Sequence, residues 1–143
     1  MAKKEQNTPI SHAGKMQPQA TDLEEAVLGA LMLDSDALSN SIEILRPESF
    51  YNPAHRMIFS AIQDLFNSAQ PVDILTVTNA LRQTGEIKSV GGPIYVSQLT
   101  DRVASAANIE THARIISQKY IQRELIRISD LIIRDAYDDT TDV

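Results

Sequence analysis

The chain has 143 residues, of which 43% are hydrophobic, and this is enough for one domain with a packed core. Its formal net charge of −6 disfavours a nucleic-acid-binding surface, because affinity for phosphate depends on clustered Lys and Arg side chains. The lack of cysteine excludes disulfides and thiolate metal sites, and no apolar run approaches the roughly 20 residues that span a membrane. We therefore expect a cytoplasmic protein without membrane contact.

Residues 1–20 are expected to form a disordered leader. They have low hydrophobicity, contain Gln, Pro, Ser and Gly, and lack the apolar region of a signal peptide. Lys3, Lys4 and Lys15 oppose only Glu5, and three lysines are too few for a nucleic-acid or lipid site. A flexible tail is the favoured interpretation.

Two helices are predicted at the start of the globular part. Thr21 and Glu24 have the spacing of a capping box, in which each side chain satisfies a free backbone donor at the helix N-terminus. The apolar residues that follow repeat at helical spacing: Leu23, Val27 and Ala30. A second helix is expected over residues 36–45, with Ser35 as its N-cap and Pro47 after its end.

A capping signal also opens the stretch FYNPAHRMIF, residues 50–59. Asn52 is a favoured N-cap and Pro53 suits the first helical position, so His55 and Arg56 fall in or just after the first turn of a helix. A catalytic histidine needs an orienting acid and a nucleophile or substrate nearby, and the sequence offers no recognisable partner. We therefore predict a structural or surface role for His55.

Capping and turn residues predict two further helices. Asp73 is a good N-cap and Gly85 suits the position just past a helix end, so a helix is expected between them. Gly91 and Gly92 predict a tight turn, and Pro93 the start of a short helix. The glycine pair lacks the Gly-x-Gly pattern and the following lysine of a phosphate-binding loop, so a turn is favoured.

A single long helix is predicted over residues 105–137, because this segment contains no proline or glycine. One face of its first half fits attachment to the globule: Ile109, Ile116 and Tyr120. Further along, four residues keep the 4-3-4 spacing of a coiled-coil seam: Ile121, Leu125, Ile128 and Ile132. A second apolar stripe lies well round the same helix: Ile126, Ile133 and Tyr137.

These two stripes require two neighbours, since one packed helix covers roughly one stripe. The acidic stretch DAYDDTTDV at the end of the chain offers no further helix. One alternative is that the long helix folds back and is buried on both sides. A helix of this length would overshoot a domain of about 100 residues, so we favour an intermolecular seam.

No pattern in the sequence supports catalysis. His12, His55 and His112 lack metal-binding spacing, and the Gly14-Lys15 pair lacks the preceding glycine of a nucleotide-binding loop. The adjacent acidic pair Glu24-Glu25 is predicted to be solvated surface, because neighbours on a helix do not face each other.

Five stretches together resemble a known family: EEAVLGALMLD, FYNPAHRMIFSAI, PVDILTVTNALRQTGEI, VGGPIYVSQL and SAANIETHARII. In this order, and at about this spacing, they are similar to the N-terminal domain of bacterial replicative DNA helicases of the DnaB family. The similarity covers residues 18–137. Pro93 and His112 depart from the family pattern, in which an aliphatic and an aromatic residue often stand, and both departures concern local contacts.

The resemblance implies an all-α fold, in which a helical globule carries a protruding antiparallel helical hairpin. Residues 21–104 are then the globular subdomain, residues 105–137 the first arm of the dimerisation hairpin, and residues 138–143 an acidic truncated end. In the family, hairpins pair subunits, and a trimer of dimers forms the N-terminal collar of a hexamer. The collar binds DNA primase, and a helicase loader is a further candidate partner.

By the same resemblance, the full-length parent is an ATP-dependent 5′–3′ replicative DNA helicase of the bacterial cytoplasm. ATP and Mg are expected only in a C-terminal motor domain, so neither a cofactor nor catalysis is expected in this fragment. The fragment is therefore expected to serve assembly and docking, with little or no direct nucleic-acid binding.

Site residues follow from the resemblance and from the helical pattern. By resemblance, the candidates for a primase-facing surface are Tyr95, Ile126 and Ile132. Each has an alternative role, as core for Tyr95 and as dimer or hairpin packing for the two isoleucines. By the seam pattern, the candidates for self-association are Ile121, Leu125, Ile128 and Ile132.

The sequence also raises two alternative functions. In a helix-turn-helix DNA-binding module, the segment after Asp73 would be the recognition helix, but it offers only Asn79, Arg82 and Gln83 toward DNA. A small hydrolase using His55 would need partners that the sequence does not reveal. Both are less favoured than the assembly domain.

Overall fold

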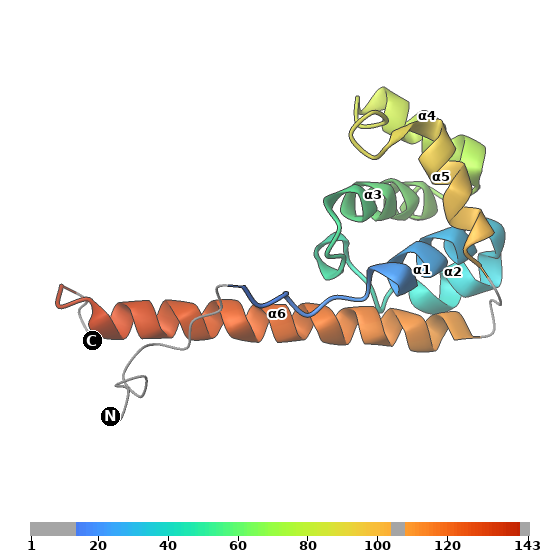
Figure 1. The fold of residues 1–143 in the computed structure, drawn as a ribbon. Helices are drawn as coiled ribbons and strands as arrows, with labels where there is room; N and C mark the ends of the chain where they lie inside the picture. Colours follow the sequence, from blue (N-terminus) through green and yellow to red (C-terminus); the bar gives the residue numbers. More distant parts are fainter. Residues whose placement is uncertain (1–13, 104–107, 141–143) are drawn as a thin grey trace.

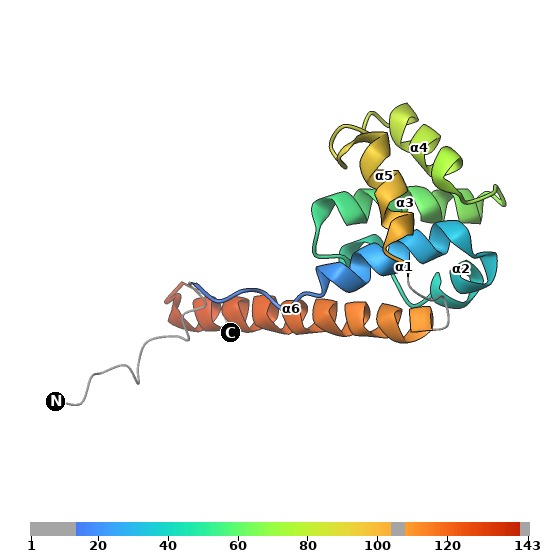
Figure 2. The ribbon, with the colours of Figure 1, turned by 45° about the vertical axis from the view of Figure 1, so that its right-hand side comes forward.

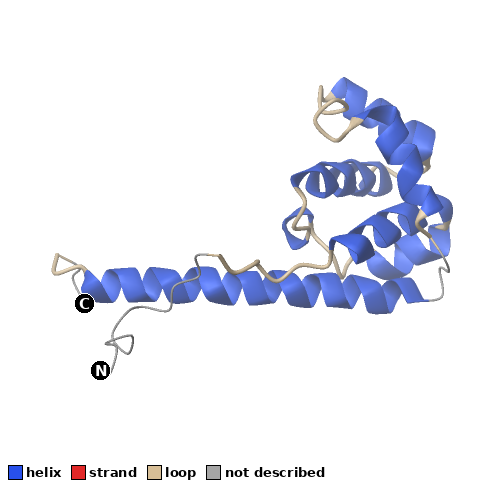
Figure 3. Cartoon of the chain, viewed as in Figure 1, coloured by secondary structure: helices blue, strands red, loops and turns tan. Residues whose placement is uncertain are grey.

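The computed structural model describes residues 14–103 and 108–140, and in this part of the chain all regular structure is helical. The elements are α1 (Thr21–Leu33), α2 (Ser35–Ser41), the 3-10 helix η2 (Pro47–Ser49), α3 (Pro53–Asn67), α4 (Ile74–Gln83), α5 (Gly92–Asp101) and α6 (Ile109–Tyr137). Figure 3 shows the same elements by type. The all-α prediction is confirmed.

The helices form a globule at one end of a long rod (Figure 1). Helix α1 packs against α5 and α6, and α3 packs against α4 and η2. The first half of α6 lies under the globule, whereas its second half continues beyond it, as the turned view in Figure 2 also shows. Among the described residues, no helix combines the length and apolar character needed to cross a membrane.

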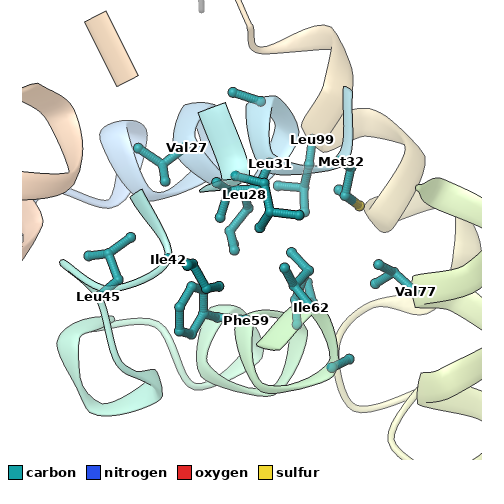
Figure 4. Close-up of a cluster of buried hydrophobic side chains, with 14 of the residues drawn as sticks. Val27, Leu28, Leu31, Met32, Ile42, Leu45, Phe59, Ile62, Val77 and Leu99 are labelled. Atoms are coloured by element: carbon teal, nitrogen blue, oxygen red, sulfur yellow. The ribbon is translucent and has the colours of Figure 1, made fainter. Parts of the chain in front are cut away.

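A single apolar core holds the globule together. In Figure 4, Leu28 and Leu31 of α1 face Phe59 and Ile62 of α3, and Leu99 of α5 closes the cluster. These five side chains are essentially inaccessible to solvent. Burial of each such side chain contributes roughly 1.5–3 kcal/mol, so α1, which reaches several neighbours, is the centre of the fold.

Local capping signals place most helix ends as predicted. Asn52 caps α3 by accepting the Ala54 N–H at 2.9 Å, and Pro53 is the first residue of the helix. Asp73 and Thr76 form a reciprocal capping box at the start of α4. After α4 ends, Gly85 adopts a φ of 78°, which suits glycine.

Two predicted N-terminal caps are wrong. Helix α1 does begin at Thr21, but its N-cap is Ala20 and no side chain caps it, because Glu24 is turned into the protein. Helix α2 is capped by Asp34 rather than Ser35, since the Asp34 carboxylate accepts two backbone N–H groups. It also ends at Ser41, earlier than residue 45, and its remaining residues form a turn.

The N-terminal segment of residues 14–20, which we expected to belong to the leader, runs beside α6 in both views (Figures 1 and 2). The Arg123 guanidinium of α6 donates to the Pro18 carbonyl at 2.7 Å. This contact joins positions 105 residues apart in sequence. Residues 1–13 of the expected leader, and residues 105–107 of the expected long helix, lie outside the described residues.

Candidate functional site

The predicted seam on α6 is exposed. Ile121, Leu125, Ile128 and Ile132 are 54%, 59%, 44% and 63% accessible, respectively. Ile109 and Ile116, on the face expected to hold the globule, are buried. The face of α6 that carries Ile109 and Ile116 therefore completes the core, whereas the face that carries the seam is open to solvent. Leu131, also exposed, adds to this surface and was missed by the sequence pattern.

The second predicted stripe is partly covered. Ile126 and Ile133 are half-buried, and Tyr137 is exposed. The N-terminal segment of residues 14–20 runs beside the same rod, which the helical pattern does not predict. All four residues of the Ile121–Ile132 seam are exposed, so this seam is the more open of the two stripes.

The three candidates for a primase-facing surface do not form one patch. Tyr95 lies on α5 in the globule, whereas Ile126 and Ile132 lie on the free half of α6 (Figure 1). A single partner that contacts all three must therefore reach from the globule to the rod, or span two subunits.

The loop of residues 50–52, between η2 and α3, has its backbone bound by charged side chains. Arg56 donates to the Phe50 carbonyl at 2.7 Å and to the Tyr51 carbonyl at 3.2 Å. Glu24 accepts the N–H groups of Tyr51 and Asn52 at 2.8 and 3.3 Å. A non-helical loop buried against a core must satisfy its backbone groups in this way, because secondary structure does not do so.

Arg123 connects this loop to the rod. It donates to the Ser49 carbonyl at 2.9 Å as well as to that of Pro18, and its guanidinium lies 5.5 Å from the Tyr51 ring and 5.9 Å from the Tyr120 ring. Desolvation by burial, and secondarily the nearby Arg56, lower the pKa of Arg123, while Glu24 raises it. Arginine remains charged throughout the physiological range, so it is suited to this position.

His55 has two partners that the sequence did not reveal. Its ring is fully buried, with Nδ1 2.8 Å from Glu24 Oε1 and Nε2 2.6 Å from the Tyr95 hydroxyl. Glu24 is also buried, so its prediction as solvated surface is wrong. The three residues join α1, α3 and α5, and the predicted structural role of His55 agrees with this arrangement.

The hydrogen-bond partners indicate how this chain of groups is protonated. A carboxylate that already accepts two backbone N–H groups acts on His55 as an acceptor, so Nδ1 carries the hydrogen. The Nε2 lone pair is then available to accept the Tyr95 O–H. A buried ring with both nitrogens engaged cannot reach a substrate, and the hydrolase alternative loses its base.

Burial raises the pKa of Tyr95 above its ordinary value of 10.0, and the negative charges of Glu25 and Glu24 add to this effect. The positive charge of Arg102 opposes it. The neutral hydroxyl is therefore favoured in the folded state, in agreement with its role as a donor to His55.

This shift predicts a loss of stability at alkaline pH. Because the folded-state pKa of Tyr95 is raised, its contribution to stability is complete below pH 10.0 and is lost as pH rises through the folded-state pKa. Urea unfolding from about pH 8 to about pH 11.5 should show a smaller decline for Tyr95→Phe than for the wild type. Parallel declines in the two proteins would contradict the assignment.

The helix-turn-helix alternative gains no support from α4. This helix carries one basic residue, Arg82, and its buried face, which includes Val77 and Leu81, is used by the core. In addition, among the described residues no group of three or more His, Asp or Glu side chains is arranged to hold a metal ion.

Together, these features define an all-α domain in which a helical globule carries a rod with exposed apolar side chains. The model of the DnaB-like helicase N terminal domain family matches residues 16–118. The chain therefore belongs to this family, and the resemblance seen in the sequence is confirmed.

Similar proteins agree with this placement. The replicative DNA helicase DnaB of Rhodothermus marinus is 50% identical over 130 residues, which are 91% of this chain and 14% of that protein. The crystal structure of the N-terminal domain of DnaB helicase from Mycobacterium tuberculosis is 34% identical, with a TM-score of 0.82, and the match covers 86% of this chain and 89% of that one.

A DnaB-like replicative helicase, described together with its interactions with primase, has a TM-score of 0.71 and 28% identity, with 81% of this chain and 27% of that one covered. The chain thus spans only a small part of these helicases. It corresponds to the N-terminal domain of a replicative DNA helicase.

Proposed function

We propose that this domain assembles and docks a hexameric replicative DNA helicase. It pairs subunits through α6 into the N-terminal collar, as a trimer of dimers, and it binds primase. The observation that carries the proposal is the row of exposed apolar side chains on α6: Ile121, Leu125, Ile128 and Ile132. Membership of the family supports the same role.

The assembly function follows from the cost of leaving this row in water. Ile121, Leu125, Ile128 and Ile132 would each contribute roughly 1–2 kcal/mol if another helix covered them, given their partial exposure. Their seam spacing is suited to a helix packed nearly parallel or antiparallel to α6. A hairpin arm or a second subunit provides such a helix, and we assign these four residues to self-association.

The docking function is supported by a relative. A DnaB-like helicase with 28% identity has been described together with its interactions with primase. On this chain we assign Tyr95, Ile126 and Ile132 to that surface, as anchors of the large apolar kind that usually dominate an interface. Because they lie on two parts of the molecule, primase would contact both the globule and the rod.

For the full-length protein, we propose ATP-dependent 5′–3′ unwinding in the bacterial cytoplasm, with ATP and Mg²⁺ bound by a motor domain outside this segment. The turn at Gly91 and Gly92 lacks the following lysine of a phosphate-binding loop. A helicase loader remains a candidate partner of the assembled protein.

The docking proposal predicts a measurable complex with a cognate primase C-terminal domain. Calorimetric titration of the wild type should give saturable binding, and Ile132→Asp should weaken it at least about 10-fold, since an interfacial charge without a partner costs more than 1.4 kcal/mol. Arg134→Gln, which changes net charge by the same single unit at an exposed position of α6, should bind like the wild type. If the wild type mixed with the primase domain gives neither heat nor a shift in sedimentation, the docking proposal is wrong.

A further inference from the structure

Tyr95 is held in place by His55 and by the backbone of Gly91. Its hydroxyl lies 2.6 Å from His55 Nε2, and its ring is nearly parallel to that of His55, with 7° between the planes and 6.1 Å between the centroids. On another side it packs on the backbone of Gly91, where a Cβ atom would lie 3.0 Å from Tyr95 Cβ. Gly91 has a φ of 108° at the start of α5, so a residue without a side chain is needed there for both reasons.

His55 is itself held in place by Glu24 and Phe50. Its Nδ1 is bonded to Glu24, and Phe50 meets its ring edge-on, with 82° between the planes. Glu24 is 1% exposed and is bound in turn by the backbone N–H groups of Tyr51 and Asn52. A continuous series of hydrogen bonds therefore runs from the loop before α3 to the Tyr95 hydroxyl.

Tyr95 also lies near two charged side chains, Glu25 and Arg102. The residue is only half-buried, and the nearby Glu25 carboxylate lies 3.5 Å from the Arg102 guanidinium. Both charges act on the Tyr95 hydroxyl. A half-buried aromatic side chain near an ion pair is the combination of an anchor and a polar rim that binding surfaces often have.

We propose that Glu24 and His55 are positioning residues, which fix Tyr95 with its hydroxyl turned inward and its ring presented to the docking partner. The inference rests on the proposed docking function of Tyr95. A ring fixed before binding loses little side-chain freedom when the partner arrives. The partner group that meets Tyr95 is therefore an apolar side chain that packs on the ring, because the hydroxyl is already engaged.

The first test is a double-mutant cycle for binding to the cognate primase C-terminal domain. Tyr95→Phe removes the hydroxyl and His55→Leu removes its acceptor, so each is expected to weaken binding about 5-fold, and the double variant about as much as one single variant. Losses that multiply to about 25-fold would overturn the proposal, because the hydroxyl and His55 would then act separately.

Two further variants separate positioning from loss of folding. His55→Gln supplies an amide N–H for Glu24 and an oxygen for the Tyr95 O–H, so it should restore most of the affinity lost in His55→Leu. Tyr120→Phe makes the same chemical change as Tyr95→Phe at a half-buried tyrosine on the globule-facing side of α6, and it should leave affinity unchanged. If His55→Leu does not fold, a wild-type affinity for Tyr95→Phe would by itself overturn the proposal.

An independent measurement does not require a partner. Nitrogen-15 NMR of histidine-labelled protein should show one of the three histidines protonated at Nδ1, with an Nε2 signal that shifts in Tyr95→Phe. An unchanged Nε2 signal would overturn the positioning role even if primase binds. Conversely, the expected NMR shift without any primase binding would leave Tyr95 fixed and would remove only the docking function.

Discussion

Leu125→Asp and Ile128→Asp are each expected to abolish self-association of the chain through α6. Both side chains lie on the exposed seam, at 59% and 44% accessibility. A carboxylate buried in an apolar seam without a partner costs several kcal/mol, and about 3 kcal/mol already corresponds to a more than 100-fold weaker complex. Sedimentation of the wild type beside the two variants measures the effect.

A matched control for this experiment is Arg134→Gln. It changes net charge by one unit, as the aspartate variants do, and Arg134 is exposed in the last turn of α6. Arg134 lies nine residues after Leu125 in α6. Because each residue turns the helix by about 100°, the two side chains lie about 180° apart, on opposite sides of the helix. The control should associate like the wild type. A wild type that remains monomeric at high micromolar concentration would count against the seam.

Gly29→Ala is expected to destabilise the domain strongly, although alanine favours helices more than glycine does. Gly29 lies in α1 where it crosses α5, and a Cβ atom there would lie 2.0 Å from the Leu99 carbonyl oxygen and 2.8 Å from Val103 Cγ2. The backbone of Leu99 cannot give way without moving α5. We expect a loss of about 3 kcal/mol in the free energy of unfolding, the upper end of the roughly 1–3 kcal/mol that overpacking usually costs, because the clash is with backbone.

Thermal and urea unfolding of Gly29→Ala should be compared with Gly85→Ala. Gly85 has a positive φ but open space around its Cβ position, so its substitution carries only a backbone cost of about 1–2 kcal/mol. The expected order of stability is wild type, then Gly85→Ala, then Gly29→Ala. A Gly29→Ala variant that melts above the wild type would show that helix propensity dominates and that α1 and α5 do not cross as closely as described.

The exposed seam shows how much of the candidate site can be predicted without coordinates. A helix without proline or glycine, with apolar residues at 4-3-4 spacing, was expected to present Ile121, Leu125, Ile128 and Ile132 away from the globule, and the structure leaves them exposed. What they bind stays a prediction. The pattern could not show that residues 14–20 run beside the same rod, since that segment has no periodicity to analyse.

Glu24 shows where sequence reasoning fails. Its spacing from Thr21 fits a capping box, and its neighbour Glu25 suggested a solvated pair, yet its partners lie 27, 28 and 31 residues away in the chain. Tyr95, 40 residues beyond His55, completes the series of hydrogen bonds. A buried carboxylate beside a histidine and a tyrosine leaves no local signature, because each of these residue types also occurs singly on surfaces.

By itself, the sequence determined the helical class, the caps at Asn52 and Asp73, the turn after α4 and the apolar row on α6. These features depend on backbone hydrogen bonds within one turn and on the helical repeat, both of which are local. Only the tertiary structure decided which side chains meet at His55, how closely α1 crosses α5 at Gly29, and that Pro18 lies against Arg123 of α6. Those outcomes depend on how side chains of distant helices pack together, and no local pattern records that packing.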